Sequence, residues 1–366
     1  MKRPLFVFAG QSNMMGASVY PPKSPVVTAN SFEYKHKARR LGHPTGDFLP
    51  AAYPAGEFSY ADLEAAYAPH MINDRGESLL TDYGKNTFFC PSMCNLKSDA
   101  DKTEYPFATF SEATAPKSAT PAPMLAKAWE EAGGACAYAH ITKGGIPFSH
   151  YMTDEMAEDY ARRIKAYNQD HGTDYPTSLP PRMAGAADYF FEKCRDFFAD
   201  AKKQFPSDDL CQKCLFWLQG EADARGSVAE YEIKLDILWE RLKSLGFTHF
   251  FCIRVDFFGN DGIWKVMQAQ ERFTSRHPDA YMLTRAASFF PYAGREERDW
   301  FLTPPTEEYH ACRDSFYGFS NQHINEKGFS VITRHAIKNL VRVLKEGKEP
   351  LLEEENITAL LTPPSP

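Results

Sequence analysis

The chain has 366 residues, of which 43% are hydrophobic and 24% are charged, values that are ordinary for a globular protein. Its formal net charge is −7 at pH 7, and this mild acidity argues against nucleic acid as the main partner, because phosphate binding needs a concentrated basic face. At this length we expect one α/β domain over residues 1–345, with an inserted subregion at 19–122 and a loosely held C-terminal tail at 346–366.

The start of the chain does not predict a secretory signal. The apolar run from Leu5 to Ala9 is too short, and the polar residues Gln11, Ser12 and Asn13 stand where an apolar core would continue. Other stretches also fall short of membrane-spanning length. We therefore expect a cytoplasmic protein with no membrane partner.

The same apolar run predicts a strand that ends in a serine. It breaks at Gly10 and puts Ser12 where a strand gives way to a helix or loop. A nucleophile can sit at such a position. A serine hydroxyl reacts only with help, so this hypothesis needs a histidine to take its proton and amide donors to hold the developing oxyanion.

Residues 19 to about 123 lose regular periodicity and hold 12 of the 26 prolines together with many Tyr and Phe residues. Long irregular segments in compact proteins are usually functional, and this aromatic content is too high for plain disorder. We interpret the segment as an ordered insertion over or beside the site. The alternative is that this segment covers the domain without contacting a ligand.

Regular elements alternate from residue 123 onward. The pattern predicts helices over about 124–132, 154–167, 184–205, 228–245, 263–274 and 325–344, and strands over about 135–141, 214–218, 249–255 and 280–284. Thr153 and the pair Ser227 and Glu230 are expected helix caps. Strands that alternate with helices imply a doubly wound parallel sheet between two helical layers.

Three of the predicted strands end in residues that can serve a ligand site. These ends are Ser12, the pair Gly144-Gly145 and the run from Gln219 to Glu221. In a doubly wound sheet the carboxyl ends of the strands share one edge, where ligands bind. We therefore expect the three ends to lie close together.

The three strand ends and one later block also carry a family resemblance. The blocks are Gly10-Gln11-Ser12-Asn13-Met14, Gly144-Gly145, Trp217-x-Gln219-Gly220-Glu221-x-Asp223, and His323 followed by Asn325 and Gly328. In this order the chain resembles the sialate O-acetylesterase-like (carbohydrate esterase) branch of the SGNH, or GDSL-like, hydrolases. The resemblance covers residues 4–16 and about 117–340.

The resemblance implies a flavodoxin-like three-layer α/β/α fold and a serine esterase that removes an acetyl or similar short acyl group from a carbohydrate. By motif position Ser12 is the nucleophile and His323 the general base. The oxyanion hole comes from the backbone amides of Ser12 and Gly145 and from one side chain. Neither a metal nor an organic cofactor is implied.

The sequence departs from the family pattern at two places. Ala222 stands where related hydrolases carry an asparagine oxyanion donor, and Gln219 is our replacement candidate. Ser320 stands three residues before the histidine, where the family usually has an aspartate. The candidates for orienting the histidine are then Glu221, Asp314, and the hydroxyl or backbone carbonyl of Ser320.

Each of these residues can also have a purely structural role. Ser12 can be a helix N-cap, and Glu221 and Asp223 can cap the helix that follows them. Three further histidines compete for the role of base, namely His140, His150 and His310.

Two other classes of function and one metal site stay open at this point. Ser320 and the aromatic insertion also fit a glycan-binding protein with little or no activity, and the same Ser12 and His323 fit a sugar O-acyltransferase. The pairs Cys90-x3-Cys94 and Cys211-x2-Cys214 can form a four-thiolate zinc site, although reduced buried thiols fit them better.

Overall fold

The computed structural model describes residues 2–15, 28–35, 47–50, 120–142, 145–182, 185–255, 262–292, 323–324 and 326–352. These residues form a seven-stranded sheet with the order β3-β2-β4-β1-β5-β6-β7. Adjacent strands are parallel, except that β3 is antiparallel to β2. The strands are β1 (Arg3–Gly10), β2 (Phe32–Lys35), β3 (Asp47–Pro50), β4 (Ala137–Thr142), β5 (Leu210–Leu218), β6 (His249–Ile253) and β7 (Ala280–Thr284).

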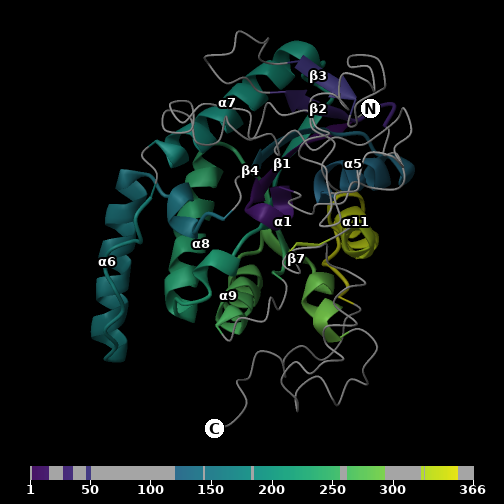
Figure 1. The fold of residues 1–366 in the computed structure, drawn as a ribbon. Coiled ribbons are helices and arrows are strands. Elements are labelled where there is room, and N and C mark those ends of the chain that lie inside the picture. The colour runs from purple at the N-terminus through teal and green to yellow at the C-terminus, as the bar shows by residue number, and fades with distance from the viewer. Residues whose placement is uncertain are drawn as a thin grey trace, which may run out of the picture.

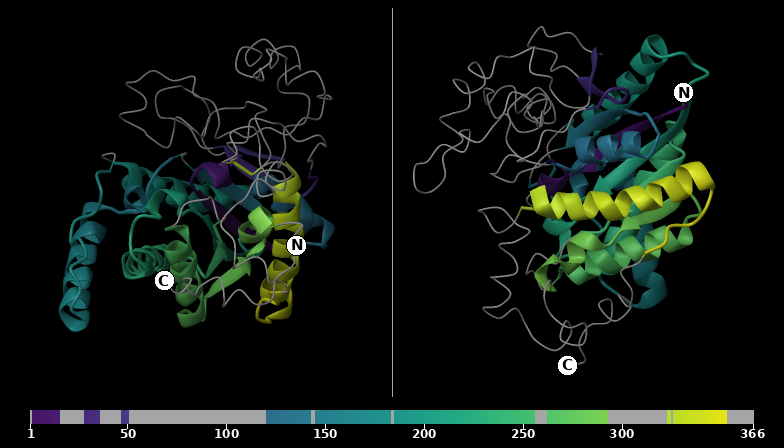
Figure 2. Two further views of the ribbon diagram at one scale, coloured as in Figure 1. Left: turned by 60° about the horizontal axis from the view of Figure 1, so that its bottom comes forward. Right: turned by 90° about the vertical axis from the view of Figure 1, so that its right-hand side faces the viewer.

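Helices cover both faces of the sheet. They are α1 (Ser12–Met15), α5 (Pro121–Glu131), α6 (Asp154–His171), α7 (Ala186–Gln204), α8 (Val228–Ser244), α9 (Ile263–Arg276) and α11 (Glu326–Glu346), with 3₁₀ turns η2 (Phe148–Tyr151), η3 (Glu221–Asp223) and η4 (Ala286–Tyr292). Helices α5 and α11 pack together on one face, while α7, α8 and α9 lie on the other, with α6 outside α8 (Figure 1 and Figure 2). The expected three-layer α/β/α fold is confirmed. None of the described helices is long and apolar enough to cross a membrane.

The strand order locates the ligand edge of the sheet. Apart from the two short strands β2 and β3, the order is β4-β1-β5-β6-β7, which is the flavodoxin-like order with its direction of winding reversed at β1. In sheets of this order ligands bind at the carboxyl ends of the two strands that flank the reversal. Here these strands are β1 and β5, which end next to Ser12 and Gln219.

The core of the sheet is apolar and aromatic. Leu5 to Ala9 in β1 and residues 214–218 in β5 are each at most 2% exposed. The ring of Phe8 stacks on that of Phe216, with centroids 4.6 Å apart. Uninterrupted apolar runs of this kind belong to strands that are covered on both faces. The polar groups of these two strands are therefore found at and beyond their ends.

The sequence did not predict β2 and β3, which lie inside the 19–122 segment. Each has four residues, too few for an alternating pattern. Their stability comes from distant parts of the chain: β2 pairs with β4, and the Glu130 carboxylate accepts hydrogen bonds of 2.7–3.0 Å from the amides of Ala29, Asn30 and Ser31. The two strands are regular elements that the sequence did not indicate within the expected ordered insertion, and residues 51–119 lie outside the described residues.

The expected helix caps are confirmed. The Thr153 hydroxyl accepts a hydrogen bond of 3.3 Å from the Met156 amide at the start of α6. At the start of α8, Ser227 and Glu230 form both bonds of a capping box, at 3.1 and 2.7 Å. Such caps satisfy amides that have no partner within the helix.

The first residues after α11 are held more firmly than the sequence suggests. The Leu351 amide donates to the Asn339 side chain at 2.7 Å, and the Lys348 amide donates to the Arg342 carbonyl at 2.9 Å. The expectation of a loose tail therefore does not apply to residues 347–352. Residues 353–366 lie outside the described part of the chain.

The turn between β1 and α1 requires a glycine, which gives a first prediction. Gly10 has φ +152°, and a Cβ atom there would lie 2.0 Å from the Leu218 carbonyl oxygen of β5. We expect Gly10→Ala to lower the free energy of unfolding by about 3 kcal/mol or more, because it adds a backbone clash to an unfavourable φ. Urea unfolding followed by circular dichroism measures the loss.

Gly172→Ala is the matched control for that experiment. Gly172 also has a positive φ, +64°, but a Cβ atom there would meet nothing within 4 Å. We expect it to lose only about 1 kcal/mol, the strain of the left-handed conformation alone. Equal losses in the two variants would contradict the clash with β5.

Candidate active site

Ser12 is the first residue of α1, directly beyond the end of β1. Its side chain is partly exposed, whereas the flanking Gln11 and Asn13 are buried. The turn before it is tied down on both sides, because the Gln11 amide donates to the Leu218 carbonyl at 3.2 Å and the buried Tyr151 hydroxyl donates to the Gly10 carbonyl at 2.7 Å. A hydroxyl group thus reaches the ligand edge of the sheet from a rigid turn.

The backbone amides of Ser12 and Gly145 have no acceptor among the described residues. Gly145 is exposed and has φ +69°, and nothing lies within 4 Å of the place where a Cβ atom would be. Its neighbour Gly144 lies outside the described residues. Unpaired amides at a strand-to-helix edge are the type of donor that an oxyanion requires.

Gln219 is completely buried, and its side chain is already paired. Its Nε2 lies 2.7 Å from Asp223 Oδ2 and 3.3 Å from the Ile146 carbonyl, while its Oε1 lies 2.8 Å from the Tyr231 hydroxyl. To donate to an oxyanion, the amide of Gln219 would have to leave Asp223 or Ile146. In this arrangement it joins the end of β5 to the turn that follows Gly145.

Asp223 fixes the same turn from a second direction. Its Oδ2 accepts a hydrogen bond of 2.7 Å from the Phe148 amide, and its Oδ1 lies 3.2 Å from the Lys234 ammonium group on α8. The side chains of Asp223 and Lys234 are 4% and 5% exposed. A buried carboxylate needs this number of partners, because its desolvation costs several kcal/mol. Asp223 therefore positions the turn rather than capping α8.

Asn13 is the residue that brings the distant blocks together. It is 1% exposed. Its Nδ2 donates to Glu221 Oε1 at 2.8 Å, and its Oδ1 accepts from the Ile324 amide at 3.0 Å. One side chain thus contacts the block after β5 and the block that contains His323, and it follows Ser12 directly in sequence. Sequence reasoning assigned no role to Asn13, although its place inside the Gly10–Met14 block was an available signal.

His323 lies next to the residue that Asn13 holds. Burial lowers the pKa of the His323 imidazole below its ordinary value of 6.5, so the ring is neutral at pH 7 and can accept a proton. No hydrogen bond joins the Ser12 hydroxyl to this ring in the described part of the chain. Such contacts are often long in the absence of substrate.

Glu221 is linked through Asn13 to Ile324, the residue that follows His323. Its Oε1 accepts from Asn13, and its Oε2 is buried without a hydrogen-bond partner among the described residues. Burial raises the pKa of the Glu221 carboxyl, and the nearby Asp223 charge raises it further. The other candidates for orienting the histidine, Ser320 and Asp314, lie outside the described residues.

The competing histidines have other surroundings. His140 is buried in β4, and its Nε2 lies 2.8 Å from the Met14 carbonyl, beneath α1. His150 is buried in the η2 turn, and His310 lies outside the described residues. Of these, His140 supports the turn of Ser12 from below.

Of the four cysteines considered for a zinc site, two lie in the described residues. Cys214 is buried in β5, and burial raises the pKa of its thiol well above the usual value. Cys211 is partly buried in the same strand, whereas Cys90 and Cys94 fall outside the described ranges. Within those ranges no group of three or more His, Cys, Asp or Glu side chains could hold a metal ion.

No protein-family model and no curated protein sequence matches the chain. Solved structures with a similar course of the chain include a carbohydrate acetylesterase from Xanthomonas citri, with 14% identity, a TM-score of 0.40 and coverage of 94% of this chain and 57% of that one. NanS has 11% identity and a TM-score of 0.47 over 94% and 98% of the two chains. A protein from Arabidopsis thaliana has 11% identity and a TM-score of 0.35 over 76% and 84%. At such identities the chemistry has to be argued from the residues of this chain.

The double contact of Asn13 gives a second prediction. Asn13→Ala leaves the buried Ile324 amide and the Glu221 carboxyl without their partner. We expect the free energy of unfolding to fall by about 2 to 4 kcal/mol, since each unpaired buried group costs about 1 to 3 kcal/mol. We also expect any hydrolysis by the folded protein to fall at least about tenfold. Thermal unfolding and an ester assay measure the two effects.

Asn339→Ala is the matched control for Asn13→Ala. Asn339 is also a buried asparagine with two backbone partners, Leu283 at 2.9 Å and Leu351 at 2.7 Å, but it joins α11 to β7 and the C-terminal segment. We expect a similar loss of stability with activity retained in the folded fraction. Equal effects of the two variants on activity would contradict a specific role for Asn13.

Proposed function

We propose that the chain is a serine esterase that removes an acetyl or similar short acyl group from a carbohydrate through an acyl-enzyme intermediate. Ser12 is the nucleophile and His323 the general base. The single observation that carries the proposal is the contact of the buried Asn13 side chain with the Ile324 amide at 3.0 Å. It brings the residues next to Ser12 and His323 into direct contact at the edge where this fold binds ligands.

The proposed reaction has two steps. The Ser12 hydroxyl attacks the ester carbonyl while the neutral His323 takes its proton, and the negative oxygen of the tetrahedral intermediate lies against the Ser12 and Gly145 amides. His323 then gives the proton to the departing sugar oxygen, which leaves an acyl group on Ser12. In the second step His323 deprotonates a water molecule that attacks this acyl group, and Ser12 is restored with release of the acid.

In this proposal the buried polar residues position the reacting ones. Asn13 and Glu221 hold the segment of His323 against the turn of Ser12. Gln219 and Asp223 hold the turn that follows Gly145. Among Ser320, Asp314 and the carbonyls near them, one group is proposed to accept a hydrogen bond from His323 and fix its tautomer, because a base without such a partner is far less effective.

A binding protein with little or no turnover is the second candidate. The observation that favours it is Ser320, a serine where the resembled family has an aspartate. Retention of a sugar ligand without any ester hydrolysis would support it. An acyltransferase would instead pass the acyl group from Ser12 to an added sugar acceptor rather than to water.

The role of Ser12 gives a third prediction. We expect Ser12→Ala to lower the hydrolysis of 4-nitrophenyl acetate at least about a thousandfold, because no other group in the proposal forms the acyl intermediate. Labelling by a fluorophosphonate probe should be lost in the same variant. Circular dichroism checks that the fold is intact.

Ser275→Ala serves as the control for that variant. Ser275 is exposed on α9, and its hydroxyl donates only to the Arg272 carbonyl within its own helix, at 2.9 Å. Its turnover and labelling should match those of the natural chain. If Ser12→Ala hydrolysed the ester at an unchanged rate, the proposed mechanism would be wrong.

The environment of His323 gives a fourth prediction, on pH. Since burial lowers the pKa of His323, the base stays neutral until the pH falls below 6.5. We therefore expect kcat/KM to be flat near pH 7 and to fall as the pH drops through a pKa below 6.5, approaching tenfold per pH unit. A pH profile of initial rates, with the fold monitored at each pH, measures this limb. An acid limb centred above pH 6.5 would contradict the role of His323.

A further inference from the structure

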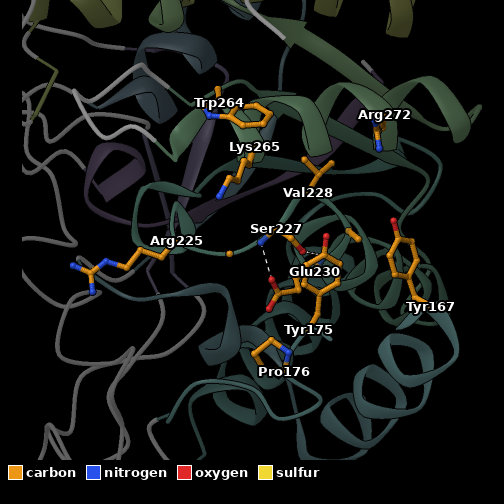
Figure 3. Close-up of a pocket in the computed structure, with 12 residues that line it drawn as sticks. Tyr167, Tyr175, Pro176, Arg225, Ser227, Val228, Glu230, Trp264, Lys265 and Arg272 are labelled. Carbon is orange, nitrogen blue, oxygen red and sulfur yellow. Dashed lines mark hydrogen bonds between the residues drawn. The ribbon is translucent and has the colours of Figure 1, made fainter. Parts of the chain in front are cut away.

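A pocket of about 500 Å³ opens beside the loop that follows β5. The end of α6, residues 175–176, the loop before α8 and the exposed side of α9 form its walls. Figure 3 shows Lys265 directed from α9 toward Ser227, with the ring of Trp264 beside it, while Arg225 extends outward at the rim. A cavity of this size holds one or two sugar rings, within the range of small-molecule sites.

The walls of this pocket carry unbalanced positive charge. Arg225, Lys265 and Arg272 line it, and none of the three forms an ion pair or side-chain hydrogen bond among the described residues. The single carboxylate in the lining, Glu230, is committed to the helix cap through the Ser227 amide at 2.7 Å. Arg276, further along α9, does pair with carboxylates, namely Glu232 and Asp236 on α8. Arg272 acts electrostatically on the Glu232 carboxyl without an ion pair, and the Lys265 ammonium group lies 6.0 Å from the centroid of the Trp264 ring. Within the lining, therefore, no carboxylate balances the charge of Arg225 and Lys265.

The same walls present aromatic rings. Tyr167 and Tyr175 lie with ring centroids 6.0 Å apart, and Tyr167 is stacked on its other side against His171 at 4.0 Å. Figure 3 shows these tyrosines across the pocket from Trp264. All three rings are partly exposed. Ring faces of this kind pack against the apolar C–H face of a sugar.

The pocket adjoins the candidate active site through one short loop. Glu221, at the start of this loop, is bonded to Asn13 next to Ser12, and Arg225 follows only four residues later in the pocket lining. Four residues span at most about 14 Å even when fully extended. The loop that Asn13 holds beside Ser12 therefore leads directly into the lining of the pocket.

We propose that this pocket binds a sugar that carries a phosphate or sulfate ester, next to the acylated sugar at Ser12. Lys265 and Arg272 come from α9 and Arg225 from the loop at the rim, so the positive charge is spread over the pocket. A phosphate or sulfate ester, whose oxygens diverge, suits such spread charge better than a flat carboxylate, which a single two-pronged arginine satisfies. The choice of a sugar as the carrier rests on the proposed function. The anion site itself depends only on the pocket.

Isothermal titration calorimetry on the full chain tests the proposal with glucose 6-phosphate, glucose 6-sulfate, glucuronate, glucose and inorganic phosphate. We expect one of the two esters, or both, to bind more tightly than the other three probes, and to weaken as NaCl rises. The double variant Lys265→Gln and Arg272→Gln should weaken that binding about a hundredfold, about tenfold for each cation. Lys165→Gln, an exposed lysine of α6 outside the pocket, should leave it unchanged.

Three results would overturn the proposal. Glucuronate binding as tightly as both esters would show a carboxylate site. If inorganic phosphate bound as tightly as glucose 6-phosphate, the sugar would contribute nothing to binding in the pocket. If the double variant and Lys165→Gln bound the esters equally well, the binding site would lie outside this pocket.

The same titration on Ser12→Ala separates this inference from the proposed function. The anion site does not use the Ser12 hydroxyl, so glucose 6-phosphate or glucose 6-sulfate should bind Ser12→Ala as it binds the natural chain. Absence of ester hydrolysis together with this binding would count against the esterase alone. Hydrolysis without any binding of the two esters would count against the pocket alone.

Discussion

The pair of hydrogen bonds made by Asn13 is the constraint on which the candidate site depends. A primary amide buried to 1% exposure must be paired, and Asn13 finds its partners in two loops that lie far away in the sequence. Its bond to the Ile324 amide spans 311 residues. Since Ser12 precedes Asn13 and His323 precedes Ile324, one buried amide fixes both the proposed nucleophile and the proposed base to the end of β1. Ser12 and His323 themselves stay partly exposed.

A second polar layer supports the edge from below. Gln219 and Asp223 are buried beyond the end of β5, and together they hold the Ile146 carbonyl, the Phe148 amide and the Lys234 ammonium group. Buried polar groups are costly unless every one is paired, and a fully paired network is rigid. The edge of the sheet thus consists of an apolar core, then a paired polar layer, and then the amides of Ser12 and Gly145, which have no acceptor among the residues that the structure describes. Preorganised donors of this kind lose little energy to reorganisation when charge develops.

The parts of this arrangement that sequence could predict are the local ones. Apolar runs such as Leu5 to Ala9 predicted the strands, the capping box of Ser227 and Glu230 predicted the start of α8, and alternation predicted the convergence of strand ends on one edge. The pairing of Gln219 was beyond the sequence, because a glutamine beside a candidate nucleophile has the same pattern whether its amide faces substrate or Asp223. The strands β2 and β3 were missed because distant contacts hold them in place: β2 pairs with β4, Glu130 bonds the residues just before β2, and β3 pairs with β2.

The loop of residues 221–227 leads from the Asn13 contact into the basic pocket and supports the proposal that one ligand spans both. Its first residue, Glu221, is bonded to Asn13, its middle is anchored by Asp223 to the turn after Gly145, and its last residue, Ser227, caps α8 inside the basic pocket. The start of α9 presses on the same loop, where a Cβ atom at Gly262 would lie 1.9 Å from the Ala224 carbonyl. A loop fixed at both ends and in the middle holds the separation between Ser12 and the pocket constant. A ligand that spans both sites therefore gains affinity from this preorganisation as well as from its contacts.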